Sequence, residues 1–148
     1  MNQPDINLKA FLKLIRFAEH KREDGGVYTV MYGGGTFTDT SKHPNKLVTK
    51  WGKSSTAAGA YQILHSSWKE AKDLGILTDM SPDSQDKYAV WKIKQRGALD
   101  YVLAGDLDHA IPKLRNEWTS LPGAKQSHMK MTEAKAKFNE YVAEFSKP

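Results

Sequence analysis

The chain has no cysteine among its 148 residues. A disulfide framework, a zinc site with thiolate ligands and a cysteine nucleophile are therefore excluded. The N-terminal stretch MNQPDINLKAFLKLIRF lacks a long uncharged apolar run, so we expect neither a signal peptide nor a membrane span there. The protein is expected to be made in a cytoplasm and to need another export route for any work outside it.

Several familiar catalytic motifs are also missing. The five histidines form no HExxH pattern and no tight metal-ligand spacing, and no serine lies in a GxSxG turn. The run Tyr32–Gly35 is rich in glycine, but no Gly-Lys-Ser/Thr follows it and it does not open a helix. A phosphate-binding loop is therefore rejected, because it needs backbone amides at a helix N-terminus.

The charge balance is basic, with 22 Lys and Arg against 17 Asp and Glu, a formal charge of +5 and a pI of about 9.3. A basic surface suggests an anionic partner: nucleic acid, a membrane surface or an acidic polymer. No basic run has the density of a nucleic-acid-binding arm, and no aromatic-rich RNA-binding signature appears. The length and the 39% hydrophobic content are typical of one globular domain, residues 1–148, with a single core.

The first helical pattern ends on a carboxylate. Leu12, Ile15 and Glu19 are three and four residues apart, so their side chains share one face of a helix. We predict an amphipathic helix from Asn7 to Arg22, stopped by Gly25-Gly26.

Two interpretations of Glu19 follow from this pattern. A carboxylate that faces a core is costly when ionised, so its pKa should rise, and a carboxylic acid that stays protonated near neutral pH can act as a general acid. Alternatively, Glu19 lies beyond the edge of the core, solvated or paired with Lys21 or Arg22.

The remaining pattern predicts mostly helix with a small sheet after the first helix. Short strands are predicted over Val27–Tyr32, Thr36–Thr38 and Leu47–Thr49, and helices over Ser55–Gly75 (with a break near His65-Ser66), Ser81–Gly97, Ala98–Ala104, Asp106–Trp118 and Thr132–Phe145. No βαβ alternation appears, so a parallel sheet is not expected.

Other side chains are candidates for a substrate site. Asp39 could supply a second carboxylate, or it could cap a turn with Thr40 or Ser41. The pair Tyr61-Gln62 offers a ring, a hydroxyl and an amide, a combination that suits a sugar or amide substrate. The alternative is close helix packing that simply buries Tyr61. Of the four tryptophans, we expect at most one to touch ligand.

Five stretches, taken together and in order, resemble the lambda-type bacteriophage endolysins, which are peptidoglycan lytic transglycosylases: AFLKLIRFAEH, GGGTFTDTSKHPNKLVT, STAAGAYQIL, SPDSQDKYAVWKIKQRGAL and WTSLPGA. The resemblance runs from about Lys9 to about Ala124. It implies an α+β, lysozyme-like fold in which a helical lobe and a small antiparallel β lobe flank a glycan-binding cleft. No metal or organic cofactor is implied.

The same resemblance assigns roles to individual residues. It implies that Glu19 is the catalytic acid and that Tyr61 and Gln62 belong to the substrate site beside it. Trp68 matches a tryptophan of the family and is a further candidate for substrate binding. Asp39, together with His43, lies in a matching loop that edges the groove in the family.

One departure bears on mechanism. Hydrolytic phage lysozymes of another kind place an Asp nine residues after the glutamate and a Thr six further on, where this chain has Tyr28 and Gly34. The missing carboxylate favours the transglycosylase route, in which Glu19 alone transfers both protons. Two alternatives stay open: a hydrolytic muramidase that uses Asp39 or Asp24 with water, and a non-catalytic domain that binds glycan or nucleic acid.

The resemblance also implies partners and a location. The substrate would be the glycan strands of peptidoglycan, whose stem carboxylates the basic surface would attract. We expect no nucleic-acid partner, no stable membrane association and a monomer. A holin is expected for export, with the protein held in the host bacterial cytoplasm and released to the periplasm and cell wall at lysis.

Overall fold

The first helix, α1 (Gln3–His20), has an identifiable start and stop. Asn2 is its N-cap, and the Asn2 side chain accepts a hydrogen bond of 2.9 Å from a backbone N–H of the first turn. The helix ends at Lys21, whose left-handed backbone (φ 56°) lets its N–H bond the carbonyl of Phe17. The predicted helix is confirmed, but it starts earlier than Asn7, and the predicted stop at the glycine pair is wrong because Lys21 already ends the helix.

The computed structural model describes residues 1–125 and 127–148. These residues form two compact units: Met1–Lys21 with Lys92–Pro148, and Arg22–Trp91. The division falls within α3 (Pro82–Gln95).

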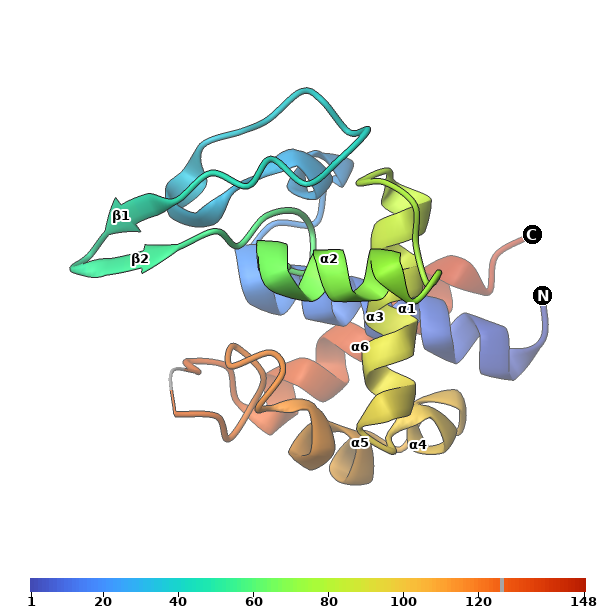
Figure 1. Cartoon of the computed structure of the whole chain (residues 1–148). Coiled ribbons are helices and arrows are strands. Elements are labelled where there is room, and N and C mark those ends of the chain that lie inside the picture. The colour runs from blue at the N-terminus through green and yellow to red at the C-terminus, as the bar shows by residue number, and fades with distance from the viewer. Residues whose placement is uncertain (126) are drawn as a thin grey trace. The chain divides into compact units, whose positions relative to one another are not determined.

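The first unit is helical. Besides α1 it contains α4 (Leu99–Leu103), α5 (Leu107–Leu114) and α6 (Met131–Phe145), and α1 packs against both α4 and α6 (Figure 1). Its core consists of fully buried side chains, the largest being Phe11, Leu14, Ile15, Ile93, Ile111, Leu114, Leu121 and Tyr141. Burial of this apolar surface is the main term that holds the unit together.

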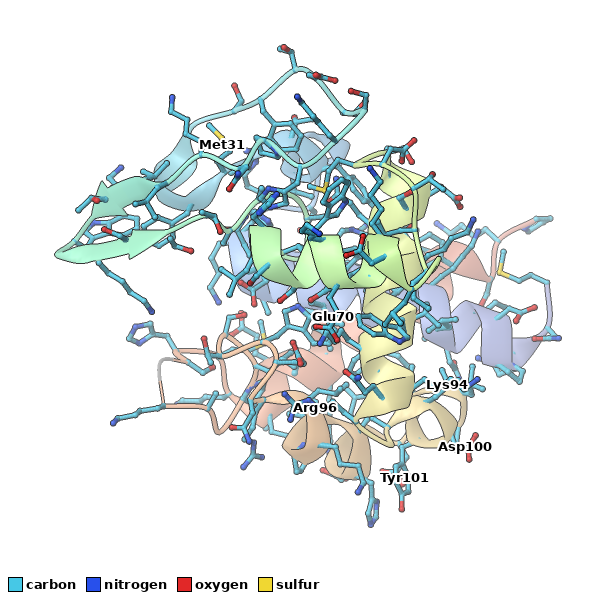
Figure 2. All side chains as sticks on the ribbon, viewed as in Figure 1. Met31, Glu70, Lys94, Arg96, Asp100 and Tyr101 are labelled. Carbon is cyan, nitrogen blue, oxygen red and sulfur yellow. The ribbon has the colours of Figure 1, made fainter. Side chains whose placement is uncertain are left out.

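Polar contacts tie the same helices together at their edges. The side chain of Lys13 on α1 pairs with Glu144 on α6 at 2.7 Å and lies over the ring of Tyr141. Tyr101 on α4, labelled in Figure 2, stacks on His109 of α5 with ring centroids 5.1 Å apart.

The predicted C-terminal helices are confirmed with shifted ends. The helix predicted over Asp106–Trp118 stops at Leu114, and its start is fixed by Asp106, whose side chain caps the first turn through the N–H of His109. In the last helix Phe138 and Tyr141 are buried, whereas Val142 is half-buried.

The second unit has little regular structure before α2 (His65–Asp73). Its two strands, β1 (Val48–Lys50) and β2 (Lys53–Ser55), pair antiparallel, with Val48 opposite Ser55 (Figure 1). Both turn residues, Trp51 and Gly52, have positive φ, as a tight two-residue hairpin turn requires. The strand predicted near residues 47–49 is confirmed as β1.

The other two predicted strands are wrong. Residues 25–29 and 32–34 form the short 3-10 helices η1 (Gly25–Thr29) and η2 (Tyr32–Gly34), and only an isolated bridge joins Val30 to Thr36. Asp24 caps the N–H of Gly26 and so starts a turn, and Gly33 and Gly34 have positive φ. The β-branched and aromatic residues here suggested strands, but the turns leave no length for a ladder.

The helix predicted over Ser55–Gly75 is correct only in its second half, α2. Before it, Ala58 and Ile63 exchange two backbone hydrogen bonds, of 3.0 and 2.8 Å, around a tight turn. Gly59 (φ 86°) and Gln62 (φ 50°) are left-handed in that turn, so a helix cannot pass through it.

α3 begins as predicted. Ser81 precedes Pro82, and the Ser81 hydroxyl accepts a hydrogen bond from the N–H of Ser84. Six α-helices and one small antiparallel sheet among the described residues confirm the α+β class. Within residues 1–125 and 127–148, no helix combines the length and apolar character that a membrane crossing needs.

Candidate active site

Glu19 lies in the last turn of α1, at the end of its buried stripe. Phe11 and Ile15 on that stripe are fully buried and Ala18 is 2% exposed, whereas the Glu19 side chain is half-buried. The predicted alignment of a carboxylate with the apolar face is therefore confirmed. Glu19 Oε1 accepts a hydrogen bond of 2.9 Å from the Ser120 hydroxyl.

The surroundings of Glu19 favour its neutral form. Burial raises the pKa of Glu19 from 4.5 to about 7, because the charged form loses hydration. The hydrogen bond from Ser120 and the positive charge of Lys21 act in the opposite direction, since both stabilise the carboxylate. The carboxyl group can therefore be an acid or a base near neutral pH, as general acid–base chemistry requires.

Tyr61 belongs to the second unit and is buried there, with 1% of its surface exposed. Its hydroxyl donates to Asp86 Oδ1 at 2.6 Å, and the hydroxyl of Tyr28 donates to the same oxygen at 2.7 Å. The rings of Tyr28 and Tyr61 meet edge to face, 6.3 Å between centroids. Asp86 thus holds two phenols in fixed positions.

Gln62 is next to Tyr61 in the left-handed turn that precedes α2. Its Nε2 donates to the carbonyl oxygens of Gly59 at 2.9 Å and Val30 at 3.2 Å. These two bonds fix the plane of the carboxamide. Tyr61 and Gln62 are consecutive in this turn, and their place in a substrate site stays a prediction.

Asp39 caps a turn. Its Oδ1 accepts hydrogen bonds from the backbone N–H and the hydroxyl of Ser41, at 2.9 and 2.6 Å. These bonds lower the pKa of Asp39, and the side chain is exposed. Asp39 also lines a surface pocket of about 350 Å³ that includes Phe37 and Lys42. This is the turn-capping alternative that the sequence left open.

Trp68 and His43 pack together in the second unit, their rings 6.0 Å apart. Trp68 is 5% exposed, and its Nε1 donates to the carbonyl of Asp79 at 2.9 Å. His43 is buried: its Nδ1 accepts from the N–H of Asn45, so Nε2 carries the proton and donates to the carbonyl of Ile63. Burial lowers the pKa of His43, which keeps the ring neutral. Both side chains hold the scaffold of this unit.

Asp24 is engaged with a neighbouring cation. Both of its oxygens bond the guanidinium of Arg22, at 2.9 and 2.6 Å, and this pairing lowers the pKa of Asp24 to about 2. Among the described residues, no group of three or more His, Asp or Glu side chains is placed to hold a metal ion.

The sequence profile of the Endolysin family matches residues 9–145, nearly the whole chain. This chain belongs to the endolysin family. It is 48% identical to the endolysin of Escherichia phage lambda over 125 residues, which cover 78% of this chain and 77% of the relative. It is 38% identical to the endolysin of Escherichia phage P2 over 133 residues, covering 80% and 81%.

Two solved structures are similar to this endolysin-family chain. Lambda lysozyme in complex with a chitohexasaccharide has a TM-score of 0.83 and 38% identity, covering 95% of this chain and 97% of that one. Another lysozyme structure from bacteriophage lambda has a TM-score of 0.76 and 36% identity, covering 99% and 96%. The predicted lysozyme-like fold is thus confirmed, and the chain is a peptidoglycan-cleaving enzyme of the lysozyme-like glycosidase type.

Sequence reasoning missed three polar residues of these sites: Ser120, Asp86 and Gln85. Ser120 lies 101 positions from Glu19, so no local periodicity could pair them. Asp86 and Gln85 lie in the first turns of α3, where an acidic or polar residue is ordinarily read as solvated. They lie in the stretches WTSLPGA and SPDSQDKYAV, whose resemblance to the family was the one available signal.

Proposed function

We propose that this endolysin-family enzyme cleaves the bond between N-acetylmuramic acid and N-acetylglucosamine as a lytic transglycosylase, with Glu19 as its acid and its base. The observation that carries the proposal is the half-buried carboxyl of Glu19, whose pKa burial raises to about 7. Such a group is partly protonated and partly ionised at neutral pH, so it can both donate and accept a proton.

In the first step Glu19 donates its proton to the glycosidic oxygen. The bond from the anomeric carbon to that oxygen breaks, and N-acetylglucosamine leaves with that oxygen as its neutral 4-hydroxyl. Positive charge develops at the anomeric carbon of the muramic acid, as in an oxocarbenium ion. The Glu19 carboxylate that remains carries the compensating negative charge.

In the second step the carboxylate recovers a proton. It takes the proton of the C6 hydroxyl of the same muramic acid while O6 bonds to the anomeric carbon. The product is a 1,6-anhydro ring, and Glu19 returns to its protonated form. One carboxyl group serves both transfers, so neither water nor a second carboxylate takes part.

The surroundings of the other candidate carboxylates support this route over hydrolysis. A base that activates water must be able to take up a proton near the working pH. Asp24 is tied to Arg22 with its pKa lowered to about 2, and Asp39 is capped by Ser41 with its pKa also lowered. Neither side chain is adapted to that task.

A glycan substrate is supported by the complex of lambda lysozyme with a chitohexasaccharide, a chain of amino-sugar units. We propose that Gln62 contacts glycan through its side-chain oxygen, because its Nε2 is already committed to two backbone carbonyls. Tyr61 would act indirectly, through the turn that it anchors against Asp86. A Gln62→Ala variant that thermal unfolding shows to be folded should bind murein more weakly, and unchanged binding would remove Gln62 from this role.

Mass spectrometry of murein digests tests the reaction. A transglycosylase leaves anhydro-muramyl ends, which are one water lighter than hydrolysed ends and have no reducing end. Reducing ends alone would show a muramidase and overturn the proposal. The Glu19→Gln variant tests the residue: it should fold and bind murein yet fail to clear permeabilised Gram-negative cells.

Family membership also supports two biological expectations, a monomer and release through a holin pore. Expression without a pore-forming partner should leave the host intact, and induction of a holin should trigger lysis. Detection of the enzyme outside the inner membrane before any pore forms would contradict this part of the proposal. Sedimentation would test the monomer.

A further inference from the structure

Ser120 is the side chain that holds the Glu19 carboxyl within the first unit. Its Oγ donates to Glu19 Oε1 at 2.9 Å, and the two residues come from α1 and from the segment between α5 and α6. The contact therefore holds one oxygen of the carboxyl group, Oε1, in a fixed position.

The segment that carries Ser120 is anchored on both sides of it. Ahead of Ser120, Glu117 accepts two hydrogen bonds from the guanidinium of Arg96, of 2.9 and 3.2 Å (Arg96 is labelled in Figure 2). The next residue, Trp118, is buried at 3% exposure, and Leu121 just beyond Ser120 is fully buried. These contacts fix where the backbone of Ser120 runs.

A second serine bonds the backbone of Ser120 directly. The Ser127 hydroxyl donates to the carbonyl of Ser120 at 2.8 Å and accepts from the N–H of Met129 at 3.1 Å. Met129 is itself buried, with 4% exposure. Ser120 therefore presents its hydroxyl from a fixed position, and such preorganisation is what a group that orients a catalytic side chain needs.

The contact acts differently on the two states of Glu19. A hydroxyl donor binds a carboxylate about twice as strongly as it binds a neutral carboxyl oxygen. Burial favours the neutral acid, and the C-terminal end of a helix dipole disfavours negative charge as well. The hydrogen bond from Ser120 offsets part of both effects.

We propose that Ser120 is a positioning residue that orients the Glu19 carboxyl and stabilises its ionised form, so that Glu19 releases its proton in the first step and recovers it in the second. The inference rests on the proposed function, because it assumes that Glu19 is the acid–base group. Without Ser120, the carboxylate left by the first step would be buried with less compensation, and the first proton transfer would slow.

The test compares Ser120→Ala with Ser120→Thr, which keeps a hydroxyl, and with a control, Ser146→Ala. The control hydroxyl bonds a carbonyl of its own helix at the end of α6. Thermal unfolding of each variant establishes that it folds. Side-chain carbon NMR then follows Glu19 directly, its signal being the one lost from the spectrum of Glu19→Gln.

Ser120→Ala should move the Glu19 titration to higher pH by about one unit, because a hydrogen bond to a charged group is lost. The alkaline limb of the murein-clearing profile should move by the same amount, with kcat lowered about three- to tenfold and KM unchanged. Ser120→Thr should restore most of both readouts, and Ser146→Ala should leave both as in the unaltered protein.

Two outcomes would overturn the proposed role of Ser120, and both can be told apart from a failure of the proposed function of Glu19. An unmoved Glu19 titration in Ser120→Ala would remove Ser120 from this role, while loss of clearing by Glu19→Gln would still support the proposed function. A titration that moves while the clearing profile stays in place would show that Glu19 does not set the rate. If Glu19→Gln also clears murein, the proposed function fails as well.

Discussion

In the second unit, the side-chain amide of Gln85 packs directly against Gly59, where no side chain could stand. A Cβ on Gly59 would overlap the side-chain oxygen of Gln85, which accepts a hydrogen bond of 2.8 Å from the N–H of Ala60. The Nε2 of Gln85 donates to the carbonyls of Tyr28 and Met80, at 2.9 Å each. One buried amide thus ties three segments of this unit together, and the turn at Gly59 must be free of a side chain to admit it.

The first prediction is that Gly59→Ala destabilises the protein strongly. The substitution forces a Cβ into the amide of Gln85 at a backbone φ of 86°, so we expect a loss of about 2–4 kcal/mol in the free energy of unfolding, measured by urea denaturation. Gly75→Ala is the matched control, because Gly75 has a similar φ of 75° but open space around its Cβ position. The control should lose only about 1 kcal/mol. Equal losses of unfolding free energy in the two variants would show that the overlap with the Gln85 amide adds nothing to the cost of the substitution.

The second prediction concerns stability against pH. The pKa of Glu19 is raised from 4.5 to about 7 in the folded state, so its neutral form stabilises the fold below pH 4.5 and this contribution is lost as the pH rises through 7. Glu19→Gln cannot ionise. Its free energy of unfolding should match that of the unaltered protein at low pH and exceed it at pH 8 by up to about 3 kcal/mol. A constant difference between pH 4 and pH 8 would contradict the raised pKa.

The third prediction separates the two chemical routes by mutation. Asp24→Asn and Asp39→Asn should each keep most of the murein-clearing rate, because both carboxylates serve turns and ion pairs. Glu19→Gln, assayed alongside, should lose it. A loss from Asp39→Asn as large as that from Glu19→Gln, in a folded protein, would favour the hydrolytic muramidase instead.

The fourth prediction concerns the buried ring of His43. Since Nδ1 accepts from the N–H of Asn45, protonation would set two donors against each other. The pKa of His43 is lowered below 6.5, so the unfolded state takes up the proton first and stability falls as the pH drops below about 6.5. Nitrogen NMR should show the ring proton on Nε2 and a titration midpoint below 6.5. A proton on Nδ1 would rule out this arrangement.

The part of the fold that the sequence predicts is the part built from periodic patterns. The apolar stripe of α1 placed Glu19 correctly, because a helix face is set by local spacing. The segment before α2 was mispredicted because its alanines, including Ala58 and Ala60, favour a helix in isolation, whereas the amide of Gln85, about 25 residues later, holds a left-handed turn at Gly59. Local propensity cannot register such a distant partner.

The candidate site likewise has one part that local spacing predicts and another that only the fold reveals. The sequence pattern pointed to a raised pKa at Glu19, since burial of the stripe follows from its spacing. It could not find Ser120, which meets Glu19 only through the fold, nor the bond of Asp86 to Tyr28 and Tyr61. Contacts between residues far apart in sequence produce no periodic pattern. The contact of Ser120 with Glu19 is of this kind, and it lowers the pKa that burial raises.

The central claim is that Glu19 alone carries both proton transfers and that no water enters the reaction. Digestion of purified murein in water labelled with heavy oxygen, followed by mass spectrometry of the muramyl ends, measures this directly. We predict anhydro ends that contain no heavy oxygen. Muramyl ends that each carry one heavy oxygen atom at a new reducing end would mean that water attacks the anomeric carbon, and the account would be wrong.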